Sequence, residues 1–112
     1  MPPLDENKRI VLVSVPSKES ALHIARRLVE QKLAACVNII PGIKSVYRWQ
    51  GKIEEDSELL LIIKTSSTRY KELQESVVHL HPYDTPEVIS LGITEGFEKY
   101  LDWIDHATST EE

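Results

Sequence analysis

Cysteine is nearly absent from this sequence, because Cys36 is the only one among 112 residues. A single cysteine excludes an internal disulfide and any metal site built from paired cysteines. No apolar run approaches the length of a membrane-spanning helix, and the opening MPPLDENKR contains no apolar stretch of the kind found in signal peptides. We therefore expect a cytoplasmic protein that does not enter a membrane.

Clustered positive charge is also missing. The chain has 13 Lys and Arg against 18 Asp and Glu, and its net charge is -5. A nucleic-acid groove normally gathers Lys and Arg on one surface, so we expect no nucleic-acid partner. The sequence also lacks a phosphate loop, an HExxH helix, an EF-hand loop and a GxSxG turn. We therefore expect that the protein is not an enzyme.

The most informative stretch present is a long hairpin predicted between residues 34 and 65. It reads AACVNIIPGIKSVYRW, then QG, then KIEEDSELLLIIKT, and Gly51 supplies the positive φ of a tight turn. Each arm would span roughly 40 Å, whereas a compact domain of this length has a radius of gyration of about 13 Å. The hairpin is therefore expected to reach beyond its own domain and to be buried by further copies of the chain. The tip residues that need such burial are Ile43, Val46, Tyr47, Trp49 and Ile53.

The rest of the chain predicts two strands and three helices. The β-branched run Ile10–Val15 is typical of a buried strand, and Ser17 is the expected N-cap of a helix that ends near Lys32. A second helix begins at Tyr70 and is ended by His81-Pro82, because the residue before proline avoids the helical region. The remaining elements are a strand over Glu87–Ile93 and a short helix from Phe97 to Ile104.

This order, β-α-β-β-α-β with an extra C-terminal helix, predicts an α+β fold. The pattern is that of a ferredoxin-like sandwich, an antiparallel sheet with two helices packed on one face. We expect residues 9–107 to form a single domain. Residues 1–8 and 108–112 are expected to be disordered ends.

Three motifs carry a resemblance to a known family. The phrases LAACVNIIPGIKSVYRWQGKIEEDSELLLIIKT, HPYDTPEVISL and YLDWI closely resemble the CutA family, the divalent-cation tolerance proteins. The resemblance covers roughly residues 10–106. It implies a homotrimer in which the long hairpins join the three subunits, in a manner similar to PII signalling proteins. It also implies roles in copper tolerance and copper binding in bacteria, and in anchoring acetylcholinesterase in animals.

Histidines are the candidate metal ligands. His79 and His81 lie close together, imidazole suits copper, and Asp84 and Glu87 follow as possible oxygen ligands. In bacterial members of the family, the proposed copper ligands are a cysteine ending the first strand and a histidine pair before Pro-Tyr. Those positions hold Ser14 and Leu80-His81 here. The resemblance therefore implies weak copper(II) binding to which His81 contributes.

A second group of residues is typical of a small-ligand pocket, and the resemblance implies that it lies near a cleft between neighbouring subunits. Amphipathic aromatic residues stand beside charged residues in this group, which also suits an anchor at a protein interface. Its members are Trp49, Tyr47, Tyr83, Glu58, Lys64 and Glu87. A small anionic molecule is the expected ligand.

Three hypotheses follow from these motifs. The family association favours a metal-responsive trimer that binds copper, and the alternatives are a PII-like sensor of a small molecule and a trimeric scaffold for protein partners. Two other features favour structural roles. Cys36 lies in an apolar stretch that predicts a buried, unreactive thiol, and the acidic run Glu54 to Glu58 is typical of a solvated hairpin arm.

Overall fold

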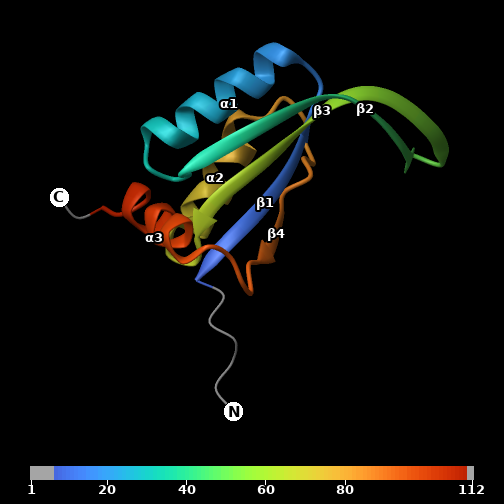
Figure 1. The fold of residues 1–112 in the computed structure, drawn as a ribbon. Coiled ribbons are helices and arrows are strands. Elements are labelled where there is room, and N and C mark those ends of the chain that lie inside the picture. The colour runs from blue at the N-terminus through green and yellow to red at the C-terminus, as the bar shows by residue number, and fades with distance from the viewer. Residues whose placement is uncertain (1–6, 111–112) are drawn as a thin grey trace.

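The computed structural model describes residues 7–110, and these form one sheet with helices against it (Figure 1). The strands are β1 (Lys8–Val15), β2 (Cys36–Trp49), β3 (Lys52–Ser66) and β4 (Ile89–Gly92), and the helices are α1 (Lys18–Glu30), α2 (Tyr70–Leu80) and α3 (Glu98–Ala107). A short 3₁₀ turn, Ser67–Arg69, leads into α2. Every strand pairing is antiparallel, in the order β2-β3-β1-β4. The predicted α+β class and element order are confirmed.

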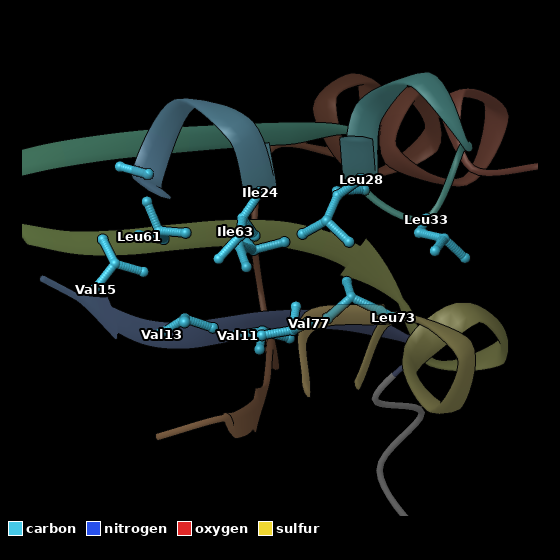
Figure 2. Close-up of a cluster of buried hydrophobic side chains, with 12 residues drawn as sticks. Val11, Val13, Val15, Ile24, Leu28, Leu33, Leu61, Ile63, Leu73 and Val77 are labelled. Atoms are coloured by element: carbon cyan, nitrogen blue, oxygen red, sulfur yellow. The ribbon is translucent and has the colours of Figure 1, made fainter. Parts of the chain in front are cut away.

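The core lies between the sheet and the helices α1 and α2 (Figure 2). Alternation along β1 and β3 sends one set of apolar side chains to this face, because successive strand residues point to opposite sides. Helical spacing in α1 and α2 supplies the matching set. The cluster includes Val11, Val13, Val15, Ile24, Leu28, Leu61, Ile63, Leu73 and Val77, all fully buried.

The helix boundaries follow local capping chemistry. Ser17 has extended backbone and its Oγ accepts a 3.1 Å hydrogen bond from the Ser20 amide. Ser17 is therefore the N-cap of α1, as predicted. The helix ends at Glu30 rather than near Lys32, because Lys32 adopts a left-handed φ of 59°. His81 ends α2 with extended backbone, as the following proline requires.

The long hairpin is confirmed and projects from the body of the molecule (Figure 1). Gln50 and Gly51 both have positive φ, which gives the tight turn expected between paired strands. A bulge at Pro41-Gly42, where Gly42 has a φ of 80°, interrupts the register of β2. β1 pairs with β3 only from Leu59 onward, so the ribbon over residues 43–58 has no third strand. The radius of gyration is 15.0 Å, above the value of about 13 Å for a compact chain.

The predicted ends of the domain need correction where the structure describes them. Lys8 was assigned to the disordered start, but it begins β1 and pairs with Ser66. Thr108 was assigned to the disordered tail, but it is only 2% exposed and its hydroxyl contacts the Ser66 hydroxyl at 3.0 Å. Residues 1–6 and 111–112, which carry the rest of those predictions, lie outside the described residues.

Two further boundaries differ from the prediction. The last strand covers Ile89–Gly92 rather than Glu87–Ile93, and these four residues pair with residues 9–12 of β1. The closing helix extends to Ala107, past the predicted Ile104. Among residues 7–110, no helix has the length and hydrophobicity needed to span a membrane.

Candidate functional site

A chain of hydrogen bonds joins the ends of three elements beneath the hairpin. The Nε2 atom of His81 lies 2.8 Å from the carbonyl oxygen of Ser14, at the end of β1. The Tyr83 amide donates to His81 Nδ1 at 3.1 Å, and the Tyr83 hydroxyl donates to Glu58 Oε2 at 2.9 Å. The His81 and Tyr83 rings also pack together, with centroids 4.8 Å apart. The loop after α2 is thereby tied to both β1 and β3.

His81 has both ring nitrogens engaged. Because Nδ1 accepts from the Tyr83 amide, the proton must lie on Nε2, which donates to the Ser14 carbonyl. The residue is 7% exposed. A metal would therefore have to displace one of these hydrogen bonds to reach a lone pair.

Glu58 is a buried carboxylate one residue beyond the end of the pairing between β1 and β3. The residue is 6% exposed, and it directly precedes Leu59, the first residue of β3 that pairs with β1. Its partner Tyr83 has a raised pKa, first because burial disfavours the phenolate and then because of the hydrogen bond and charge of Glu58.

An open hollow of about 600 Å³ lies between the hairpin and the loop after α2. Four of the five residues predicted for the ligand cleft line it, namely Trp49, Tyr83, Glu58 and Glu87. The other lining residues are Ser14, Ser45, Val46, Tyr47, Asp84 and Thr85. The volume falls within the range of small-molecule sites.

Lys64 does not line this hollow of a single chain, and its place in a cleft between neighbouring subunits stays a prediction. It lies six residues along β3 from Glu58, a distance of about 20 Å. Its ammonium group donates to the side-chain oxygen of Asn38 instead.

Two lining residues were missed by the sequence analysis. Ser45 could have been found, because strand alternation places it on the same face as Tyr47 and Trp49. Thr85 comes from an irregular loop, where no periodicity places side chains. Asp84, considered only as a metal ligand, lies in the same hollow.

The residues present do not fit a preformed copper site. Within residues 7–110, no group of three or more His, Cys, Asp and Glu side chains is placed to hold a metal ion. His79 is exposed on the last turn of α2 and does not line the hollow. His81 uses both nitrogens within the fold, as described above.

The hairpin tip exposes apolar side chains, as expected of an interface. Val46 is 64% exposed and Ile53 is 61% exposed, and register places both on the ribbon face opposite Tyr47 and Trp49. Tyr47 and Trp49 are half-exposed, and the Tyr47 hydroxyl donates to Asp56. The four predicted interface residues thus lie on two faces of the ribbon.

The sheet face away from α1 and α2 is also apolar. Pairing places the side chains of seven residues from the four strands on this face, because directly opposed residues share a side. They are Ile10, Leu12, Ile40, Leu60, Ile62, Ile89 and Leu91. Ile89 and Leu91 are each almost half-exposed.

Comparison with known proteins shows similarity to one family throughout. The model of the family described as CutA1 divalent ion tolerance protein matches residues 9–107. The divalent-cation tolerance protein CutA of Thermus thermophilus is 52% identical over 101 residues, covering 90% of this chain and 98% of that protein. A chloroplastic CutA protein of Arabidopsis thaliana is 52% identical over 99 residues, covering 88% of this chain but only 54% of its own length.

Solved structures agree with the fold. The Thermus thermophilus protein superposes with a TM-score of 0.89 at 52% identity, covering 91% of this chain and 99% of its own. CutA1 of Oryza sativa gives 0.90 at 48% identity, covering 94% and 96%. A CutA protein of Archaeoglobus fulgidus, described as periplasmic, gives 0.89 at 43% identity, covering 91% and 99%. Because relatives are described as chloroplastic or periplasmic, the cytoplasmic location stays a prediction.

Proposed function

The chain belongs to the CutA1 family of divalent ion tolerance proteins, and we propose that it acts as a homotrimer that senses a small molecule in the hollow beneath its hairpin. The observation that carries this proposal is the hollow itself, in which two lining residues, Tyr83 and Glu58, are joined by a hydrogen bond. The relatives are described as tolerance or CutA proteins rather than as enzymes. Binding rather than catalysis is therefore the activity proposed.

Assembly is supported by two apolar surfaces on one chain. The ribbon over residues 43–58 has two unpaired edges and exposed apolar residues at its tip. Unpaired edges and apolar patches favour association with another chain. The apolar sheet face defined above adds a second surface of the same kind. The number three is what the family resemblance implies, and the strand order supports the ferredoxin-like protomer expected with it.

The hollow supports a small-molecule ligand better than copper(II). It combines aromatic side chains with a few fixed polar groups, the usual composition of such sites. Copper(II) bound through His81 would have to displace the Ser14 carbonyl or the Tyr83 amide from its ring. Copper is therefore included as the competing ligand in the test.

Native mass spectrometry tests the assembly. The purified protein is expected at three times the chain mass. Val46→Glu combined with Ile53→Glu places charge on the exposed hairpin tip and is expected to reduce the trimer to monomers. Val78→Glu is the matched control, because Val78 is also an exposed valine, 48% exposed, but lies on α2. A monomeric wild-type protein at micromolar concentration would contradict the proposal.

A thermal-shift screen tests the hollow. Small polar metabolites and copper(II) are added separately to the wild type and to Trp49→Ala, with Trp103→Ala on α3 as the matched control. We expect an organic molecule to raise Tm in the wild type and in the control but not in Trp49→Ala, because ligand bound only to the folded state stabilises it. A Tm rise with copper alone, lost in His81→Ala, would favour a metal sensor instead.

A further inference from the structure

The hollow beneath the hairpin is negatively charged. Three carboxylates line it, those of Glu58, Asp84 and Glu87, and no Lys or Arg is among its lining residues. Asp56 lies next to it on the same ribbon face as Glu58. By the same alternation Lys44 and Arg48 point to the opposite ribbon face, whereas Lys52 shares the face of Trp49 but does not line the hollow.

The acidic groups of the hollow are not neutralised by ion pairs. In the part of the chain that the structure describes, the recorded ion pairs are Lys8–Asp105 and Arg69–Glu72, both remote from the hollow. Glu58 and Asp56 instead accept hydrogen bonds from the phenols of Tyr83 and Tyr47. A phenol orients a carboxylate and partly satisfies it, but leaves its charge in place.

Aromatic rings line the same space. Tyr47, Trp49 and Tyr83 are between 37% and 50% exposed and contribute to the wall of the hollow. The face of such a ring attracts a cation, Trp most strongly, and the attraction grows when water is excluded. Neither feature alone defines a ligand, but carboxylates and aromatic faces around one cavity share a preference for positive charge.

The raised pKa values of two tyrosines are consistent with negative charge in the hollow. The pKa of Tyr47 is raised from 10.0 to about 12, first by its hydrogen bond to Asp56 and also by the charges of Asp56, Glu54 and Glu58. The pKa of Tyr83 is raised by burial and then by Glu58. Both phenols resist ionisation partly because negative charge is already present.

We propose that the ligand of this hollow is an organic cation, an alkylammonium ion held by Glu58 and Glu87 against the rings of Trp49 and Tyr83. The inference rests on the proposed function and names the ligand class for the same site. It differs from the small anionic molecule expected from the sequence. Among the described residues of one chain, an anion entering this space would meet three lining carboxylates and no lining Lys or Arg.

An alkylammonium ion fits the spacing of these groups better than a metal ion does. Metal ions need several ligands within about 2–2.6 Å of one point, and no described group of His, Cys, Asp and Glu offers that convergence. An alkylammonium head is several times wider, and its charge is spread over its methyl or methylene groups. It can therefore contact a carboxylate on one side and a ring on another.

Isothermal titration calorimetry with choline and 3,3-dimethyl-1-butanol tests the inference on the purified full-length chain. The two probes have the same shape, and only choline carries charge. We expect choline to bind at least tenfold more tightly than the neutral alcohol, and its affinity to fall at high salt because the interaction is partly electrostatic.

Charge-removing variants locate the site. Glu58→Gln keeps the acceptor for Tyr83, and Glu87→Gln changes an exposed residue, so at least one of them retains the fold. Each is expected to weaken choline binding at least fivefold. Glu55→Gln is the matched control, because Glu55 lies on β3 but on the opposite ribbon face, and it is expected to leave choline binding unchanged.

Two outcomes overturn the inference in distinguishable ways. The organic-cation inference is refuted if both probes bind equally, or if Glu58→Gln and Glu87→Gln leave choline binding intact. Either result still leaves a small-molecule site. If citrate or another anion binds the wild type and this binding is lost in Trp49→Ala, the proposed function is supported and the organic-cation inference is refuted. Failure of every organic probe, together with no stabilisation in the thermal-shift screen, refutes both.

Discussion

His81 Nε2 lies 2.8 Å from the carbonyl oxygen of Ser14, a residue 67 positions earlier in the chain. This contact joins the loop after α2 to the end of β1, and the His81 ring then accepts the amide of Tyr83. The buried imidazole is therefore a structural connector beneath the hollow. The first two predictions test whether His81 connects these two segments or binds a metal ion.

His81→Ala is expected to reduce the free energy of unfolding by about 2–4 kcal/mol. The substitution removes two hydrogen bonds of roughly 1 kcal/mol each and leaves the Ser14 carbonyl and Tyr83 amide without their partner. Chemical denaturation at fixed protein concentration measures the change. His79→Ala is the control, because His79 is exposed and is expected to change stability by less than about 0.5 kcal/mol. Equal effects of the two substitutions would refute the connector role.

Copper(II) uptake is expected to be the same in the wild type and in His81→Ala. Both ring nitrogens of His81 are committed within the fold, so the ring offers no free lone pair. Calorimetric titration of copper into both proteins, each first shown to be folded by circular dichroism, measures this. Copper binding at one ion per chain that disappears only in His81→Ala would instead restore the metal-ligand prediction.

Tyr47 is expected to contribute stability that is lost between about pH 10 and pH 12. Its pKa is raised from 10.0 to about 12 in the folded chain, so folding favours the protonated phenol. The contribution is therefore complete below the unfolded value and disappears as pH rises through the folded value. The difference in stability between the wild type and Tyr47→Phe should shrink over that interval.

Denaturation at several pH values from 8 to 11.5 measures this difference. Tyr70→Phe is the control, since the Tyr70 hydroxyl donates to the uncharged side chain of Gln74. A difference between wild type and Tyr47→Phe that stays constant from pH 9 upward would show that Asp56 does not hold the phenol protonated.

Gln50→Asn is expected to stabilise the protein by about 0.5–1 kcal/mol. Gln50 has a φ of 50°, a left-handed conformation that costs most residues about 1 kcal/mol and asparagine less. Asn-Gly is also the preferred pair for this two-residue turn. Chemical denaturation at matched concentration measures the gain. Gln50→Ala keeps the steric cost and should show no gain, so a similar gain in both variants would point to another cause.

The sequence by itself determined the elements and much of the hairpin. The β-branched runs, the Ser17 cap, the Gln50-Gly51 turn and the His81-Pro82 stop all act within a few residues, so local chemistry is enough to place them. The order of these elements predicted the α+β fold class. The length of β4 was overestimated, because only Ile89–Gly92 pair in register with β1 and such pairing between distant segments is not set by local sequence.

Only the tertiary structure decided which residues form the site. Glu58 and Tyr83 are 25 positions apart and become hydrogen-bonded because the loop after α2 returns to the sheet beside β3. Lys64, by contrast, lies about 20 Å from Glu58 on the same strand, a distance that follows from six residues of extended backbone alone. Local patterns fix the direction of a side chain on its own element. The distance between side chains on different elements follows only from how those elements pack.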